Sequence, residues 1–304
     1  MPELPEVQTT VNGINKYVKG LSIKDVWTSY GSAYHAGKDN IKDPKFFAQF
    51  KKEVVGKKII GSKRIAKNIL IELSDKSIIL IHMKMTGHVL YGDYIFDKKD
   101  KKDPWKGLSP KALTDPFNRH IRFVLSLSNG KFLALSDMRR FAKVTHIKKE
   151  EIESTLHLAN IGPEPLAENF SAEIFRARLL HRPNSYVKQV LMDPSIIAGV
   201  GNIYSDELLW RAGMHPKRRV KDIKPAEFQK MFGAMQAVLK AGIDFGGDSM
   251  SDYRNILGEK GLFQEKHSAY RKTGTKCTKP KCNGTIHRIV IGARSAHYCD
   301  KHQK

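Results

Sequence analysis

The chain begins Met1-Pro2-Glu3-Leu4-Pro5-Glu6-Val7, and the residues that follow continue one regular pattern as far as Gly20. Apolar side chains recur at helical spacing at Val7, Val11, Ile14 and Val18. Proline stands near the beginning of this stretch and glycine just past its end, which is the usual order at helix termini. The sequence therefore predicts a helix that begins at Pro5, close to the start of the chain, and ends just before Gly20.

The second residue carries the first candidate for chemistry. Removal of Met1 would leave Pro2 as a secondary amine beside the carboxylates Glu3 and Glu6. A secondary amine can attack a sugar carbon and become an iminium without help from a lysine. The alternative is structural, because Pro5 can begin the helix while acidic residues stabilise its positive end. Both interpretations stand on these residues alone.

Between about Leu21 and Ile147 the pattern changes from helical spacing to short β-type runs such as residues 69–71 and 78–81. Asn129-Gly130 stands between two such runs and is a strong hairpin signal. Residues 96–116, rich in lysine, proline and glycine, are expected to form a solvated surface loop that interrupts the sheet. We therefore expect a β-sandwich in this part of the chain.

From Glu150 onward the pattern is helical again. The predicted helices are residues 171–180, 186–192, 203–212 and 225–241. The last 30 or so residues are too few for an apolar core of their own and need a covalent or metal staple. We predict an α+β protein that is long enough for roughly two domains. The predicted domains are residues 1–149, 150–266 and 267–304.

The charge balance points to a polyanionic partner. The chain has 304 residues with 53 Lys and Arg against 31 Asp and Glu, a formal charge of +22. Nucleic acid fits better than a membrane, because no apolar run approaches the roughly 18 residues of a transmembrane helix. The first residues do not resemble a signal peptide. We therefore expect a cytoplasmic protein.

The C-terminal tail has the spacing of a zinc site. Its ligand-type side chains are Cys277, Cys282, Cys299 and His302. Cys277 and Cys282 precede a hairpin-like segment, residues 285–298, and Cys299 and His302 follow it. Four protein ligands would leave no open position on the metal. The sequence predicts one structural Zn²⁺. His287 and His297 are rival fourth ligands, and unligated thiols are the alternative to a metal site.

Two turns could contact phosphate groups. The segment Ile291-Gly292-Ala293-Arg294-Ser295 would hold Arg294 at the tip of the metal-braced hairpin, where a guanidinium suits a phosphate oxygen. The glycines in Gly199-Val200-Gly201-Asn202 precede a helix, whose free amides can receive an anion, although two glycines can equally serve tight packing. Lys67 and Lys188, each considered alone, are ordinary surface charges.

Taken together, these features resemble the family of bacterial formamidopyrimidine-DNA glycosylase and endonuclease VIII over nearly the whole chain. Ordered, separate motifs carry the resemblance: residues 1–7, His82-Met83-Lys84-Met85-Thr86-Gly87, Asp137-Met138-Arg139-Arg140-Phe141, Gly162-Pro163-Glu164-Pro165-Leu166, residues 198–204, Ala212-Gly213-Met214-His215-Pro216 and the cysteine-bearing tail. Leu4 favours the formamidopyrimidine branch, because the endonuclease VIII branch typically has glycine there.

The resemblance implies a two-lobed α+β enzyme with an N-terminal β-sandwich and leading helix, a helix-two-turn-helix lobe and a C-terminal β-hairpin zinc finger. It implies a bifunctional DNA glycosylase and AP lyase that excises oxidised purines and cuts the strand by β,δ-elimination. In this interpretation Pro2 is the nucleophile, Glu3 handles protons, and Glu6 orders the site. The implied partner is double-stranded DNA with oxidised bases or abasic sites, bound by a monomer associated with the nucleoid.

The resemblance also assigns roles in DNA binding. Met85, Arg139 and Phe141 would enter the duplex in place of the extruded nucleotide. Lys67, which we group with the catalytic residues, and Asn202 and Arg294 match phosphate contacts. Lys188 matches a basic residue near the lesion.

The chain departs from the family pattern at Met138, where proline is usual, at Ala142, where glycine is usual, and in the tail, where four residues separate the first two cysteines and His302 replaces a cysteine. The lysine-rich stretch over residues 97–115 has no assigned counterpart, and adds either nonspecific DNA contact or solubility. Two other functions stay open. One is the same chemistry on oxidised pyrimidines, and the other is a noncatalytic zinc-finger DNA-binding protein.

Overall fold

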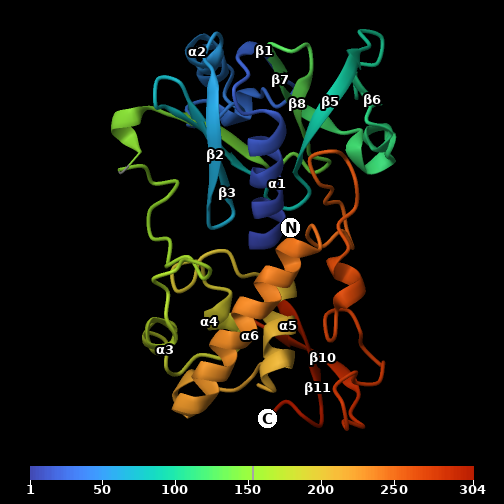
Figure 1. Ribbon diagram of the computed structural model, residues 1–304. Helices are drawn as coiled ribbons and strands as arrows, with labels where there is room; N and C mark the ends of the chain where they lie inside the picture. The colour runs from blue at the N-terminus through green and yellow to red at the C-terminus, as the bar shows by residue number, and fades with distance from the viewer. Residues whose placement is uncertain (153) are drawn as a thin grey trace. The chain divides into compact units, whose positions relative to one another are not determined.

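The structure is a computed structural model that describes residues 1–152 and 154–304. It divides into two compact units, and each is discontinuous in sequence. Unit 1 contains Met1–Ala159 and Phe245–Leu262, and unit 2 contains Asn160–Asp244 and Phe263–Lys304 (Figure 1). These units divide the chain differently from the three predicted ranges, because residues 245–262 group with unit 1 and the C-terminal hairpin groups with the helices of unit 2.

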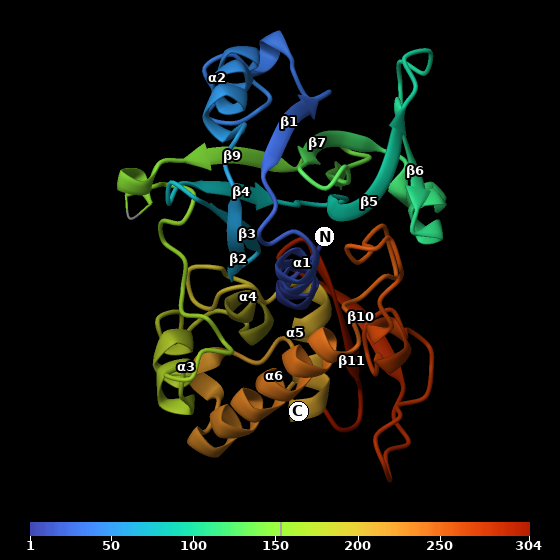
Figure 2. The ribbon, with the colours of Figure 1, turned by 45° about the horizontal axis from the view of Figure 1, so that its top comes forward.

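Unit 1 contains two antiparallel sheets. The five-stranded sheet has the order β1 (Ile23–Thr28), β7 (Ile121–Leu127), β8 (Phe132–Ser136), β5 (His88–Phe96) and β6 (Trp105–Ser109). The four-stranded sheet has the order β2 (Ile59–Ile65), β3 (Asn68–Leu73), β4 (Ile78–His82) and β9 (Lys143–Ile147). Figure 2 shows β4 and β9 side by side, as their pairing requires. The expected hairpin at Asn129-Gly130 is confirmed, since Gly130 joins β7 to β8 with φ of 80°.

One apolar core joins the two sheets. It draws Ile69 and Ile81 from the four-stranded sheet and Phe123 and Leu135 from the five-stranded sheet, and all four are at most 1% exposed. The predicted β-sandwich is confirmed by this arrangement. Two helices, α1 (Leu4–Tyr17) and α2 (Pro44–Val54), contribute further apolar side chains to the same core.

The segment expected to interrupt the sheet extends it instead. Trp105 begins β6, which pairs with β5, and its ring lies 5.1 Å from the ring of Phe96 and 5.1 Å from that of Phe132. Aromatic contacts of this kind contribute beyond the buried area alone. The prediction of a loop was wrong here because charged residues surround a single tryptophan whose partners lie on other strands.

Residues 245–262 return to unit 1 after the helices of unit 2. Ile256 is 4% exposed and belongs to the unit 1 core. A Cβ at Gly13 of α1 would lie 2.4 Å from the side chain of Ile256, so the two segments pack without space between them. Tyr91 of β5 also donates its backbone N–H to the carbonyl oxygen of Ile256, at 2.6 Å. This return segment therefore completes the first unit.

Unit 2 consists of helices and one hairpin. Its elements are α3 (Ala172–Leu180), α4 (Val187–Leu191), α5 (Asn202–Ala212), α6 (Pro225–Asp244), β10 (Ile286–Ile291) and β11 (Arg294–Cys299). All four predicted helices are confirmed within a few residues at their ends. Gly213 ends α5 in the left-handed conformation at φ of 71°, as glycine commonly does. Within the described ranges, no helix combines the length and apolar character that a membrane crossing needs.

Candidate active site and nucleic-acid-binding residues

Pro2, Glu3 and Glu6 lie at the start of α1. Glu3 is the N-cap residue, and its side chain accepts the backbone N–H of Glu6 while Glu6 Oε2 accepts the backbone N–H of Glu3, at 2.7 Å. This reciprocal pair is a capping box, which fixes the direction in which the chain enters the helix. Both carboxylates are buried, at 3% exposure for Glu3 and 1% for Glu6. Pro2 is buried too, whereas Met1 is 38% exposed.

The return segment secures Glu6 a second time. Glu6 Oε1 accepts the backbone N–H of Asp248, at 2.8 Å, and the hydroxyl of Tyr253 donates to the Glu6 carbonyl oxygen, at 3.1 Å. Burial raises the pKa of Tyr253 above its ordinary range, with a further contribution from the charge of Glu6. Both carboxylate oxygens of Glu6 thus accept backbone amides. Sequence reasoning missed Asp248 and Tyr253, since nothing local indicates that residues so distant in sequence meet α1.

The turn from His82 to Gly87 carries Met85. Gly87 donates its N–H to the carbonyl oxygen of Met83 at 3.0 Å, and a Cβ at position 87 would lie 2.4 Å from that oxygen. Only glycine therefore permits this tight turn. Met85 is half-buried on the turn, and Thr86 beside it is buried.

A buried carboxylate joins this turn to the loop that carries Arg139 and Phe141. Asp137 is fully buried and accepts the hydroxyls of Thr86, at 2.6 Å, and Tyr30, at 2.7 Å. Thr86 Oγ1 in turn accepts the backbone N–H of Arg139, at 3.1 Å. The structure thereby brings the Met85 turn and the Arg139 loop into contact, although sequence reasoning gave Thr86 and Asp137 no role of their own.

The side chains of this loop project outward. Phe141 is 50% exposed and Met138 is 52% exposed. The Arg139 guanidinium lies over the Phe141 ring, 4.9 Å from its centroid, which is a cation–π contact. Ala142, where glycine is usual, is fully buried and donates its N–H to Asp137 at 2.8 Å, so the departure from the family pattern is accommodated.

Lys67 lies in the turn between β2 and β3, where Ile65 pairs with Asn68. Its positive charge, together with that of Lys84, contributes to the lowered pKa of His82, which falls to about 3 mainly because the ring is buried. His82 is therefore a neutral imidazole at physiological pH. Its Nδ1 accepts the backbone N–H of Lys84, at 3.0 Å.

His88, at the other end of the turn, is neutral for a similar reason. Burial lowers its pKa to about 4, against the opposing effect of hydrogen bonds to Asn118 and Thr86. Nε2 lies 2.9 Å from Asn118 Oδ1. Two neutral histidines thus bracket the Met85 turn.

These histidines predict that the protein loses stability in mild acid. Their folded pKa values lie below the unfolded value of about 6.5, so the unfolded chain binds more protons and the free energy of unfolding falls as the pH drops below 6.5. Each histidine contributes up to about 1.4 kcal/mol per pH unit. Urea unfolding between about pH 6.5 and pH 5, where carboxylates stay ionised, measures this slope. His82→Gln should reduce the slope, and an unchanged slope would contradict the assignment.

In unit 2, Asn202 is the first residue of α5. Gly201 is the N-cap with an extended backbone, and Gly199 has φ of 81°. The backbone therefore needs glycine at position 199, as a tight turn before a helix does. Arg294 is exposed at the tip of the β10–β11 hairpin, where the turn residues Gly292 and Ala293 have φ of 54° and 58°.

The structure places Lys188 in the interior of unit 2, whereas the sequence predicted an exposed charge or, by resemblance, a contact near the lesion. Lys188 is 1% exposed and forms an ion pair with Asp206, which is fully buried. Its ammonium also donates to the carbonyl oxygen of Ser295, at 2.8 Å. Asp206 Oδ2 lies 2.8 Å from His297 Nδ1. Lys188 therefore contacts the residue that follows Arg294, and sequence spacing could not reveal Asp206 as its partner.

The four predicted metal ligands come together. The ligand atoms of Cys277, Cys282, Cys299 and His302 all lie within 4.8 Å of one another. His302 Nδ1 lies 3.4 Å from Cys277 Sγ, while Nε2 lies 3.0 Å from the carbonyl oxygen of Trp210. An outer hydrogen bond of this kind orients a metal-binding imidazole. The two other candidates for the fourth ligand contact carboxylates instead. His297 contacts Asp206, and His287 pairs with Asp300 at 3.7 Å.

Comparisons with known proteins agree over both units. Residues 1–144 match the formamidopyrimidine-DNA glycosylase N-terminal domain, and residues 161–254 match the formamidopyrimidine-DNA glycosylase H2TH domain. Formamidopyrimidine-DNA glycosylase of Pelotomaculum thermopropionicum is 32% identical over 304 residues, covering 100% of this chain and 99% of the relative. The enzyme of that name from Paracoccus denitrificans is 34% identical, covering 98% of each chain.

Solved structures give the same result. A complex between the Lactococcus lactis Fpg and an abasic site containing DNA aligns with TM-score 0.80 and 27% identity over 99% of both chains. A complex of a Lactococcus lactis FPG mutant with a Fapy-dG containing DNA aligns with TM-score 0.80 and 27% identity over 100% of both chains. Since the matches cover the whole length at more than 30% identity to curated relatives, the chain belongs to the formamidopyrimidine-DNA glycosylase family.

Proposed function

We propose that this protein is a bifunctional DNA glycosylase and AP lyase of base excision repair that removes oxidised purines from duplex DNA. The observation that carries the proposal is the start of α1, where Pro2 is held beside two buried carboxylates. Glu6 is bound through both oxygens to backbone amides, which suits a residue that orders the site. Glu3 lies next to the amine, which suits a residue that moves protons.

The reaction uses the Pro2 nitrogen after Met1 has been removed. The amine attacks C1′ of the damaged nucleotide, the glycosidic bond breaks, and its electron pair leaves with the base, which takes up a proton. The nitrogen loses its proton, the C1′–O4′ bond opens with its electron pair going to O4′, and O4′ takes up a proton. The resulting iminium between Pro2 and C1′ acidifies the C2′ hydrogen. Glu3 accepts the C2′ proton as β-elimination expels the 3′ phosphate, and loss of a second proton, from C4′, lets δ-elimination expel the 5′ phosphate.

The Met85 turn and the Arg139 loop serve extrusion of the nucleotide. Turning a nucleotide out of the stack costs a few kcal/mol, and side chains that occupy the vacated space offset part of that cost. Phe141 is exposed and apolar, as a wedge between bases must be, and Arg139 offers donors to the unpaired base. Asp137 keeps both segments in register through Thr86.

Replacement of Phe141 tests this role. We expect Phe141→Ala to lower the rate of base excision by at least about tenfold, because loss of a wedge leaves a cost of a few kcal/mol uncompensated. Cleavage of a preformed abasic site should change less, since no base has to be extruded there. Met138→Ala is the matched control, being equally exposed on the same loop. Equal losses in both variants would show that the loop, and not the Phe141 ring, matters.

Phosphate contacts are assigned to Lys67, Asn202 and Arg294. The exposed hairpin tip supports the assignment for Arg294, and the glycine-bearing start of α5 supports it for Asn202. For Lys188 we propose a positioning role as well as proximity to the lesion, because its ammonium holds Ser295 beside Arg294.

The tail fits one structural Zn²⁺. Three thiolates and one imidazole are a common tetrahedral set for zinc, and four protein ligands leave no position for substrate. Cys277, Cys282, Cys299 and His302 would hold the ion, which supplies folding energy and no chemistry. The cytoplasmic, nucleoid-associated location and the monomeric state are part of the same proposal.

The test is borohydride trapping on a duplex with 8-oxoguanine opposite cytosine. We expect a covalent adduct whose mass spectrum places the crosslink on Pro2. A duplex with thymine glycol measures the alternative preference for oxidised pyrimidines, which Leu4 disfavours. A crosslink on an internal lysine, or binding without any adduct, would overturn the proposed chemistry.

A further inference from the structure

The segment between β5 and β7, residues 97–120, is an ordered extension of unit 1. We call its lysine-rich tip, residues 98–102, the lysine tip. β6 anchors the segment through Trp105, which is 9% exposed and lies 5.9 Å from the ring of Trp27 as well as against Phe96. The tip is therefore carried on a packed hairpin, which Figure 1 shows in teal beside β5.

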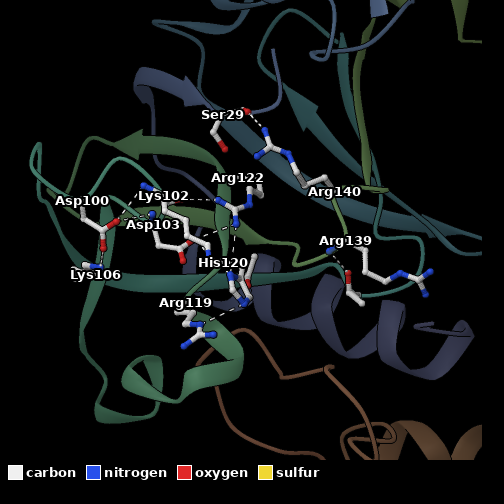
Figure 3. Close-up of polar contacts among 12 residues, drawn as sticks. Ser29, Asp100, Lys102, Asp103, Lys106, Arg119, His120, Arg122, Arg139 and Arg140 are labelled. Carbon is white, nitrogen blue, oxygen red and sulfur yellow. Dashed lines mark hydrogen bonds and ion pairs between the residues drawn. The ribbon is translucent and has the colours of Figure 1, made fainter. Parts of the chain in front are cut away.

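The two carboxylates in and next to the tip, Asp100 and Asp103, both take part in contacts within unit 1. Asp103 forms an ion pair with Arg122 of β7 at 3.1 Å, and the two side chains are only 12% and 6% exposed. Arg122 also donates to the carbonyl oxygen of Lys102, at 3.0 Å (Figure 3). Asp100 accepts the backbone N–H groups of Lys102 and Asp103 and pairs with Lys106.

The remaining charges of the tip are positive and face solvent. Lys98, Lys99, Lys101 and Lys102 are all exposed, and within residues 1–152 and 154–304 none of them forms an ion pair. Four unpaired ammonium groups within five residues repel one another, so the tip is stabilised by any polyanion that approaches it.

The same network leads toward the loop that carries Arg139. His120 lies between Asp103, at 3.4 Å, and Arg119, whose Nε lies 3.3 Å from His120 Nε2. Arg119 and His120 line a hollow in the surface of unit 1 together with Thr86 and Met138. Hydrogen bonds and ion pairs thus link the lysine tip through Arg122 and His120 to Arg119 (Figure 3). Arg119 and His120 share the hollow with Met138, the residue before Arg139.

We propose that the lysine tip and Arg119 form a second phosphate-binding surface, which extends the grip on duplex DNA beyond the Met85 turn and the Arg139 loop. The inference rests on the proposed function, because the partner is the backbone of the same duplex. Ammonium groups and a guanidinium are the groups that bind phosphate oxygens. Continuity with the Arg139 loop favours this partner over an acidic protein, and solubility alone does not require a tip buttressed by a buried ion pair.

The test measures binding to a duplex that carries tetrahydrofuran in place of the lesion, since this analogue cannot be excised. The variant replaces Lys98, Lys99, Lys101 and Lys102 together by glutamine. Each lost phosphate contact lowers the slope of log K against log salt by about 0.9. We expect the slope to fall by about 1 to 4 and the affinity at about 0.1 M salt to fall about tenfold or more.

The matched control removes the same charge elsewhere in unit 1. Lys19, Lys24, Lys45 and Lys52 are likewise exposed and lie after α1, on β1 and on α2. Their replacement by glutamine should change the slope by less than about 1. Equal changes in the salt slope for the two quadruple variants would mean that DNA responds only to the net charge of the protein, and would overturn the inference. A tip variant with the slope and affinity of the parent protein would overturn it as well. If the parent protein fails to bind the duplex, the proposed function itself fails.

The substitution Asp103→Asn tests whether DNA affinity depends on how the lysine tip is held in place or only on its positive charge. The substitution makes the protein more positive, so electrostatics alone would strengthen DNA binding. We expect the reverse, a several-fold weaker complex, because Arg122 loses its buried partner and no longer holds Lys102 and His120 in place. If the variant has the melting temperature of the parent protein and binds DNA more tightly, the lysines do not depend on the Asp103–Arg122 ion pair. That result would overturn this part of the inference.

Discussion

Protein that retains Met1 is expected to form no borohydride-trapped adduct and to lose strand cleavage by about 10³-fold or more, the scale on which loss of a nucleophile acts. With Met1 attached, the Pro2 nitrogen belongs to a peptide bond, where resonance removes its lone pair from reaction. DNA binding should persist, because the Met85 turn, the Arg139 loop and the hairpin tip are untouched. Trapping and gel assays on the 8-oxoguanine duplex measure both quantities.

The control uses the same preparation after treatment with methionine aminopeptidase, which removes Met1 and changes nothing else. Activity should return in proportion to the free Pro2 measured by mass spectrometry. The contrary result would be equal trapping by both forms, because an internal lysine such as Lys67 would then be the nucleophile.

Replacement of His302 by alanine is expected to reduce bound zinc from about one ion per chain to nearly none and to unfold the tail. Structural zinc contributes about 10–16 kcal/mol to the folding of isolated finger peptides, far more than a segment without its own apolar core can replace. Arg294 would then lose its fixed position. Because a hydrogen bond to a charged group contributes about 1.5–3 kcal/mol, DNA affinity should fall at least about tenfold.

His287→Ala is the matched control, since His287 lies on the same hairpin and pairs with Asp300. It should keep its zinc and most of its affinity. Metal analysis, hydrogen exchange over residues 275–304 and binding to the tetrahydrofuran duplex compare the two variants. Zinc retained by His302→Ala and lost by His287→Ala would reverse the ligand assignment.

The parts of the fold that depend on neighbouring residues were predictable. The helix at the N-terminus, the hairpin at Asn129-Gly130 and the four helices of unit 2 follow from local spacing and turn residues. The cluster of Cys277, Cys282, Cys299 and His302 was predictable because cysteines and histidines at such spacing have few other uses. His302 could be chosen over its rivals by spacing, and the occupied partners of His287 and His297 agree with that choice.

The parts that depend on distant partners were not predictable. The burial of Lys188 requires Asp206, and the strand at Trp105 requires rings from other strands. The carboxylate of Asp137 links two motifs that sequence reasoning treated separately. In each case the deciding contact joins residues whose spacing in the chain carries no periodic signal.

The return segment also sets the order in which the protein becomes competent during synthesis. Asp248 and Tyr253 follow Glu6 by 242 and 247 residues, so the start of α1 stays incompletely supported until most of the polypeptide has left the ribosome. A truncated translation product ending in α6 would contain α1 but lack Asp248 and Tyr253, which contact Glu6, and the Ile256 side chain. The structural support of α1 is therefore complete only after the chain has been made as far as Ile256.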